Sequence, residues 1–117
     1  MQMPSKALVL IGLAVSLFSS QPASARMPFD GPWTVTMSSV HGNCSASFYF
    51  GVQVWNGVLS ASGGGFSLTG RVSRKGAVSA TIGGGDRAYG RLLRRTGYGS
   101  WVSPSRGCTG RWSAVRR

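Results

Sequence analysis

A chain of 117 residues is long enough for one small domain and too short for two. Thirteen Lys and Arg stand against two acidic residues and a single His, so the formal net charge is +11. This composition argues against acid–base or metal-dependent catalysis, because such sites need several carboxylates or His side chains close together. The excess of positive charge instead predicts attraction to polyanions.

Residues 1–25 have the pattern of a cleavable secretory signal peptide. Lys6 gives the positive start, an apolar stretch covers residues 7–18, and small residues at 23–25 precede the expected cleavage point. The apolar stretch is far shorter than the roughly 20 residues that span a bilayer as a helix. We therefore predict a processed protein of residues 26–117 that is periplasmic or secreted. An uncleaved membrane anchor is the alternative.

The processed part has the pattern of short strands, with no run of apolar residues at helical spacing. Alternating runs rich in Val, Thr and aromatic residues are separated by turns rich in Gly and Asn. Asn56-Gly57 is the strongest hairpin signal, because a primed two-residue turn needs positive φ at both positions. The eight predicted strands cover residues 33–39, 46–55, 57–62, 66–73, 77–82, 87–94, 97–103 and 109–116.

An internal repeat with an offset of 20 residues supports this division into hairpins. Residues 63–72 align without gaps on residues 83–92, and the Gly-Arg-apolar unit recurs at residues 110–112. Two short strands with their turns have about this length, so each repeat predicts one hairpin. The equivalent arginines of the three units are Arg71, Arg91 and Arg111.

Short links between the strands predict an all-β fold in which the chain meanders up and down. Closing eight antiparallel strands into a barrel buries one face and removes both sheet edges. An open sheet or a two-layer sandwich is the alternative. We expect the interior to be filled, without a ligand cavity, by Val35, Phe48, Phe50, Val52, Phe66, Leu68, Val78 and Leu92.

Cys44 and Cys108 are the only cysteines, and they stand at the starts of the second and eighth predicted strands. In a closed meander these two strands flank the first strand and begin at the same end of the barrel. We therefore predict one disulfide, which in the chain-entropy model contributes on the order of 4 kcal/mol. Two free buried thiols are the alternative.

The segment Asp30-Gly31-Pro32-Trp33 resembles the Gly-x-Trp opening of the calycin superfamily, which includes the lipocalins and avidins. The resemblance implies that Trp33 closes the base of a barrel and that Arg116 or Arg117 packs across its ring as a cation–π pair. The predicted strands are shorter than those of typical lipocalins, so a small hydrophobic ligand is not expected. The overall plan also resembles small exported proteins of unknown function from rhizobial and related proteobacteria, a likeness that implies no activity.

No catalytic, metal or cofactor site can be assembled from the sequence. His41 lies in a predicted turn, and Asp30 and Asp86 lie at separate turns rather than as an acid–base pair. The Gly-rich tracts lack the Lys-Ser/Thr ending of a phosphate-binding loop, so we interpret them as tight turns. We therefore predict that the protein is not an enzyme.

The basic residues are the candidate anion-binding site, because guanidinium groups bind phosphate, sulfate and carboxylate in a bidentate fork. We expect the three repeat arginines on the outer face, with two basic pairs adding charge at opposite ends. Solubility alone is the alternative role for this charge. The candidates are Arg71, Arg91, Arg111, Arg74, Lys75, Arg94 and Arg95. Four aromatic residues alternate with polar ones, so some of them should be exposed: Trp55, Tyr89, Tyr98 and Trp101. They could form a stacking surface for sugars or bases, or they could be ordinary cross-strand pairs of the sheet.

We predict an exported, non-enzymatic binding protein that contacts anionic polysaccharide, lipopolysaccharide or a membrane surface through arginines, with nucleic acid also open as a partner. The second hypothesis is an inhibitor of a secreted or periplasmic protease. Bacterial metalloprotease inhibitors are similar in plan, being exported calycin-type barrels with an N-terminal arm, and residues 26–29 would be the arm here. The third is a structural envelope protein without a soluble ligand.

Overall fold

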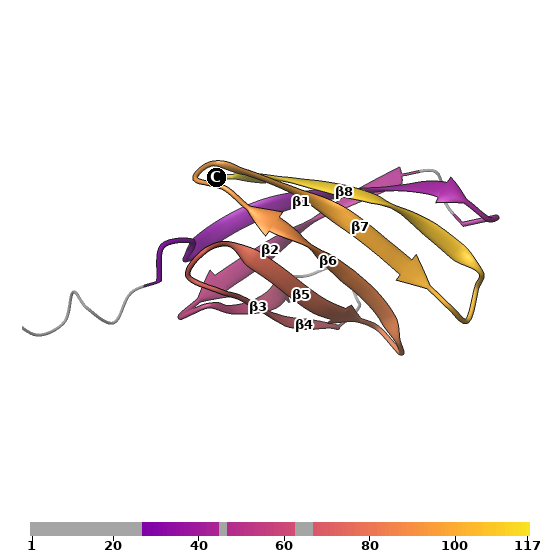
Figure 1. Ribbon diagram of the computed structural model, residues 1–117, viewed down its shortest axis with the longest axis horizontal. Helices are drawn as coiled ribbons and strands as arrows, with labels where there is room; N and C mark the ends of the chain where they lie inside the picture. Colours follow the sequence, from indigo (N-terminus) through magenta and orange to yellow (C-terminus); the bar gives the residue numbers. More distant parts are fainter. Residues whose placement is uncertain (1–26, 45–46, 63–66) are drawn as a thin grey trace, which may run out of the picture.

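The computed structural model describes residues 27–44, 47–62 and 67–117, and the eight strands in these ranges close into one antiparallel barrel (Figure 1). The predicted signal peptide, Arg26 and Phe66 lie outside the described residues. The strands are β1 (Gly31–His41), β2 (Ser47–Trp55), β3 (Val58–Ser62), β4 (Leu68–Val72), β5 (Ala77–Ile82), β6 (Asp86–Leu92), β7 (Thr96–Ser103) and β8 (Cys108–Arg116). Within these ranges, no helix is long and apolar enough to cross a membrane.

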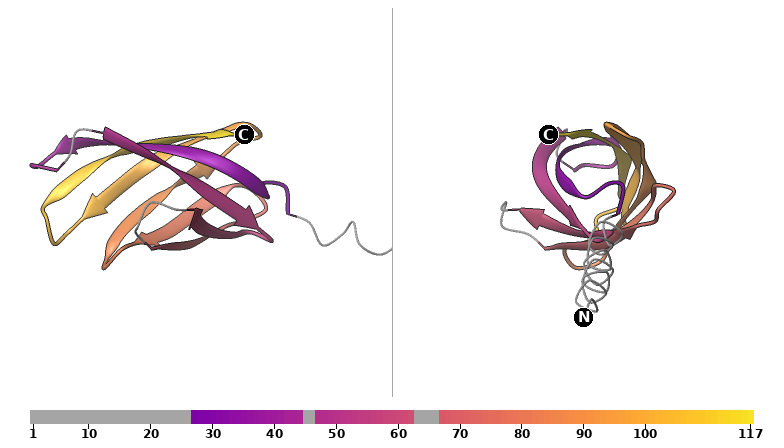
Figure 2. Two further views of the ribbon diagram at one scale, coloured as in Figure 1. Left: turned by 180° about the vertical axis from the view of Figure 1, so that it is seen from behind. Right: turned by 90° about the vertical axis from the view of Figure 1, so that its left-hand side faces the viewer.

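Each strand pairs with its neighbours in sequence, and β1 also pairs with β8 to close the sheet. Seen along its length, the barrel shows the strands surrounding one central axis (Figure 2, right). The predicted all-β, up-and-down eight-stranded barrel is therefore confirmed, and the open sheet and the sandwich are wrong.

The strands are staggered around the barrel, and the stagger determines its width. Following paired residues once around the sheet from Gly31 leads back to β1 at Ser39, eight residues further along (39 minus 31). Eight strands with this stagger are also the geometry of the TIM-barrel sheet, whose interior is packed with side chains. The stagger therefore favours a filled barrel over a calyx.

The interior is apolar and nearly full. The free space within it is about 50 Å³, lined only by apolar side chains. For comparison, an engineered apolar cavity of about 150 Å³ holds benzene. Among the described residues, the space inside the barrel is therefore smaller than a benzene-sized site.

Two tryptophans account for much of this filling, and the repeat glycines make room for them. Trp112 lies across Gly99 and Gly90 of the two preceding strands, where an added Cβ would come within 2.6 Å of the indole. Trp101 lies in the same way against Gly110 of β8. The indole N–H groups donate to backbone carbonyls of Tyr89 (3.1 Å) and Ser38 (3.0 Å), respectively. The Gly-Arg unit thus places a glycine inward and an arginine outward.

The predicted core is correct for most residues and wrong for Phe48. Phe50, Val52, Leu68, Val78 and Leu92 are buried, and Val35 is partly buried. Phe48 has the inward parity of β2 but lies at the mouth of the barrel, where it stacks on Phe50 with ring centroids 5.9 Å apart and remains 45% exposed. A side chain that points inward is buried only where neighbouring strands surround it, and this is not the case at the end of the barrel.

The start of the chain and the last strand close the base of the barrel. Trp33 is 1% exposed, and its indole N–H donates to the carbonyl of the buried Phe29 (2.9 Å). The Arg116 guanidinium carbon lies 5.3 Å from the centroid of the Trp33 ring, which is the geometry of a cation–π pair. Arg116 also donates to the carbonyls of Asp30 (2.7 Å) and Arg94 (3.0 Å). One arginine therefore joins the first strand, the last strand and the β6–β7 turn.

The predicted disulfide joins Cys44, just after β1, to Cys108 at the start of β8, with 6.1 Å between their Cα atoms. No free cysteine exists among the described residues. A structural disulfide indicates an oxidising, non-cytoplasmic compartment.

Candidate anion-binding surface

The up-and-down topology gives the barrel two ends with different turns. We call one the basic end: it contains the start of β1, the β2–β3, β4–β5 and β6–β7 turns, and the end of β8, on the left of Figure 1. Backbone bonds join its turns, from Val72 N–H to Gly57 (2.9 Å) and from Leu92 N–H to Gly76 (2.8 Å). We call the other the disulfide end: it contains the β1–β2, β3–β4, β5–β6 and β7–β8 connections.

Both predicted basic pairs lie at the basic end. Arg74 and Lys75 lie in the β4–β5 turn, and Arg94 and Arg95 in the β6–β7 turn, all four exposed. The expectation of opposite ends was wrong, because every even-numbered strand of a closed meander finishes at the same end. Arg91 connects the two turns by donating from Nη1 to the Lys75 carbonyl (2.8 Å).

The three repeat arginines all face outward, but they do not form one continuous row. Arg71 and Arg91 each stand one residue before the end of their strands, β4 and β6, and therefore adjoin the basic end. Arg111 is the fourth residue of β8, which starts at the disulfide end. The repeat therefore supplies two arginines to the basic end and leaves the third in the other half.

Positive charge at the basic end is uncompensated. Within the described residues its cations are Arg71, Arg74, Lys75, Arg91, Arg94, Arg95, Arg116 and Arg117, against the single carboxylate side chain of Asp30. That carboxylate is occupied by the β2–β3 turn, where it accepts from the backbone N–H groups of Asn56 (2.8 Å) and Gly57 (3.2 Å). In the parts of the chain that are described, the one ion pair lies at the other end.

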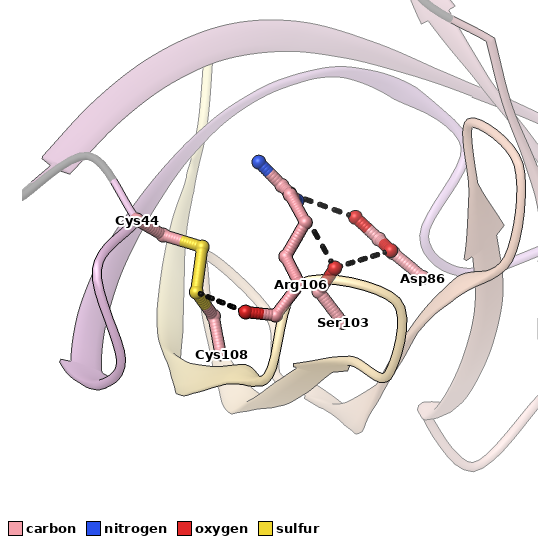
Figure 3. A network of polar contacts seen from close by, with 5 residues as sticks. All are labelled: Cys44, Asp86, Ser103, Arg106 and Cys108. Carbon is pink, nitrogen blue, oxygen red and sulfur yellow. Dashed lines mark hydrogen bonds and ion pairs between the residues drawn. A yellow bond between two sulfur atoms is a disulfide. The ribbon is translucent and has the colours of Figure 1, made fainter.

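The disulfide end holds the one ion pair of the described residues, although Arg87 and Arg111 in this half of the barrel are exposed and outside that pair. Ser103, which is fully buried, donates from Oγ to Asp86 Oδ1 (2.7 Å), and Arg106 donates to both partners, to Ser103 Oγ (3.1 Å) and to Asp86 Oδ2 (3.0 Å) (Figure 3). Figure 3 also shows the Cys44–Cys108 disulfide beside this network. Sequence reasoning missed the network, because nothing in the pattern links a carboxylate to an arginine 20 residues away.

Exposed apolar side chains accompany the cations of the basic end. Trp55 is 69% exposed, Val58 44% and Leu93 46%, in or beside the β2–β3 and β6–β7 turns. The sequence singled out Trp55 as a candidate stacking residue but gave no signal for the other two. Of the remaining aromatic candidates, Tyr89 and Tyr98 are exposed, whereas Trp101 is buried in the barrel.

The few groups capable of acid–base chemistry lie apart. His41 is exposed at the end of β1, Asp30 holds a turn at the basic end, and Asp86 is paired at the disulfide end. Among the described residues, no three His, Cys, Asp or Glu side chains are grouped so as to hold a metal ion.

The described part of the N-terminal arm packs on the barrel. Phe29 is buried at the base, with its carbonyl bound by Trp33. The Met27 backbone carbonyl accepts from Asp30 N–H (3.3 Å), and the Met27 side chain lies against Gly57. Residues 27–29 therefore pack against the barrel at its basic end and do not extend freely into solvent.

No family model matches the chain, and no curated protein is significantly similar to it.

Proposed function

We propose that the protein is an exported, non-enzymatic binding module that docks on an anionic envelope surface or polymer through its basic end. The observation that supports this most directly is the uneven distribution of charge. Eight cations of the described residues lie at the basic end against one carboxylate side chain, whereas the rest of the barrel carries three, Arg87, Arg106 and Arg111, one of them in an ion pair. A charge that served solubility alone would have no reason to gather at one end.

The construction of the basic end suits the recognition of phosphate, sulfate or carboxylate groups. Arg94 and Arg95 sit on a tight turn closed by a bond from Leu93 N–H to the Thr96 carbonyl (2.7 Å). Guanidinium groups form bidentate contacts with such anions, and a short closed turn limits the backbone freedom that is lost on binding. Near an anionic membrane surface each Lys or Arg contributes about 1 kcal/mol, so several together suffice for stable docking.

The rival hypothesis of a protease inhibitor receives less support. An inhibitory arm must extend into an enzyme cleft, but Phe29 is buried and Met27 packs against the β2–β3 turn. Extending residues 27–29 would expose the base of the barrel and break the bond from Trp33 to Phe29.

Two double variants that each remove two positive charges test the proposal. Arg94→Ser with Arg95→Ser removes them from the basic end, and Arg87→Ser with Arg111→Ser removes them from the rest of the barrel surface. The oxidised protein, expressed from the full chain in an exporting host, is titrated against anionic vesicles and a soluble polyanion. Titrations are run at low salt and at ~0.15 M, where the Debye length falls to about 8 Å.

We expect the basic-end variant to lose binding strongly at both salt concentrations and the control variant to lose little. The roughly 1 kcal/mol per charge at an anionic surface predicts a loss of about 2 kcal/mol for the first pair. Equal losses from both variants would contradict the proposal, because they would show that only the total charge matters. Binding by the wild type that vanishes at the higher salt would contradict it in the same way.

A further inference from the structure

We propose that the anionic partner is a lipid bilayer surface and that the side chains of Trp55 and Leu93 enter its interface. This inference rests on the proposed function and specifies the partner. Two of the three turns at the basic end carry an exposed apolar side chain next to cations, and this combination of groups is what a bilayer interface binds.

The first apolar tip is the β2–β3 hairpin. Trp55 and Val58 are cross-strand partners on the outer face, and Val58 is in turn paired with Arg71 of β4. An indole, a branched aliphatic group and a guanidinium therefore follow one another across three strands. The turn between them has positive φ at Asn56 (54°) and Gly57 (76°), as predicted for a primed turn.

The hairpin is also rigid enough to present its indole. Both carboxylate oxygens of Asp30 accept backbone N–H groups of the turn, at 2.8 Å from Asn56 and 3.2 Å from Gly57. A turn with a fixed backbone loses little backbone freedom when its side chains bind. Trp55 nevertheless remains 69% exposed, so its apolar surface has no cover within the described barrel.

The second apolar tip is the β6–β7 turn. Leu93 follows directly after β6, is 46% exposed, and is succeeded by Arg94 and Arg95. Val115 of β8, which pairs with Thr96 beside this turn, is 57% exposed. Apolar and basic side chains are therefore interleaved here as well.

A bilayer surface fits this combination better than a soluble polyanion or a second copy of the chain. A polyanion offers charge but no apolar layer, so it leaves the indole and the leucine side chain in water. A second copy would bring two basic ends together, and their like charges would repel. The lipid interface offers phosphates to the arginines and an apolar boundary to Trp and Leu.

Vesicle binding by a double variant and a control variant tests the insertion. Trp55→Ser with Leu93→Ser removes both apolar tips without changing the charge. Tyr49→Ser is the matched control, because Tyr49 is a 76% exposed aromatic on the same face of β2, toward the other end of the strand. Each protein is titrated with vesicles of equal parts phosphatidylglycerol and phosphatidylcholine, and with dextran sulfate as a polyanion without an apolar layer.

We expect Trp55→Ser with Leu93→Ser to weaken vesicle binding by about tenfold or more, since burial of each apolar side chain accounts for a substantial part of the affinity. Dextran sulfate binding should stay at the wild-type level, and Tyr49→Ser should match the wild type in both titrations. Unfolding curves of every variant are to be measured first, so that binding is compared only between proteins that are folded at the assay temperature.

Tryptophan fluorescence gives a second, independent measurement. Trp33, Trp101 and Trp112 are 1%, 6% and 7% exposed, so Trp55 is the tryptophan that bilayer-borne bromine atoms can reach. We expect brominated lipids to quench the wild type and not Trp55→Phe.

The outcomes separate this inference from the proposed function. If Trp55→Ser with Leu93→Ser binds vesicles like the wild type and brominated lipids do not quench, insertion is wrong, while a loss in Arg94→Ser with Arg95→Ser still supports charge-driven docking. If the apolar variant loses vesicle and dextran sulfate binding equally, insertion is also wrong. If the arginine variant binds as tightly as the wild type, both proposals fail.

Discussion

The two ends of the barrel are built from the same kind of short turn, yet they use their side chains in opposite ways. At the disulfide end, Cys44 is bonded to Cys108, and Asp86 neutralises Arg106. At the basic end Arg74, Arg94 and Arg95 are exposed, and none of them forms an ion pair within the described residues. We propose that the disulfide end mainly stabilises the fold and that the exposed arginines of the turns at the basic end mainly make contacts. Changes to these two groups of residues should therefore affect stability and binding separately.

Loss of the disulfide should give the largest effect on stability. Cys44→Ser with Cys108→Ser opens a link across 64 residues, and the chain-entropy model predicts a loss of about 4 kcal/mol. Urea unfolding of the variant and of the oxidised wild type measures this difference. Vesicle binding at a temperature where the variant is folded should be unchanged. A variant as stable as the wild type, or one that is folded but does not bind, would contradict the division of roles.

A variant of Arg116 tests whether this arginine stabilises the fold, unlike the exposed arginines of the neighbouring turns. Its guanidinium packs on Trp33 and donates to carbonyls of Asp30 and Arg94 at 2.7 and 3.0 Å. Arg116→Met keeps the length of the side chain but loses these bonds, and we expect a loss of about 2 kcal/mol in the free energy of unfolding. Arg117→Met is the matched control and should change stability by less than about 0.5 kcal/mol. Equal stabilities of the two variants would show that the Arg116 contacts do not hold the base together.

Asp86→Ala tests the polar network of the disulfide end. Removing the carboxylate leaves the fully buried Ser103 hydroxyl without its acceptor, which costs about 1–3 kcal/mol. Arg106→Ala removes the more exposed partner and leaves the bond from Ser103 to Asp86 intact, so it should cost less. Thermal and urea unfolding of both variants check this order. If Arg106→Ala is the more damaging change, the buried hydrogen bond is not the stabilising part of the network.

The barrel followed from the sequence because local signals and topology agreed. The Asn56-Gly57 turn, the alternating runs and the two cysteines each favoured a closed meander on separate grounds, and the disulfide lies where that topology requires it. Pattern also predicted most of the core. It failed for Phe48, since parity says which way a side chain points but not where the barrel ends.

The candidate surface was predicted only in part. The sequence named the basic residues of the β4–β5 and β6–β7 turns but assigned them to opposite ends, although strand parity alone would have placed them together. The sequence named Trp55 only as a candidate stacking residue. The exposed side chain of Leu93 and the link from Asp86 to Arg106 depend on exposure and on contacts between distant turns. Such contacts leave no periodic signal in one sequence.

The smallest expected effect concerns the stability of the contact arginines themselves. Arg94→Ser with Arg95→Ser removes two exposed charges whose side chains make no hydrogen bond or ion pair within the described ranges, so the free energy of unfolding should stay within about 0.5 kcal/mol of the wild type. We expect a slight increase in the free energy of unfolding, because like charges at the basic end repel one another and the variant relieves that repulsion.

Salt dependence distinguishes this relief of repulsion from an unrelated change in packing. Screening weakens the repulsion between exposed charges, so the gain should be largest in urea titrations at low ionic strength and should disappear near 1 M salt, where the Debye length is about 3 Å. A gain that persists at high salt, or a loss of stability at every salt concentration, would show that these arginines help to hold the barrel together. A salt-sensitive gain together with lost binding would mean that the basic end gives up some stability in order to present an uncompensated surface.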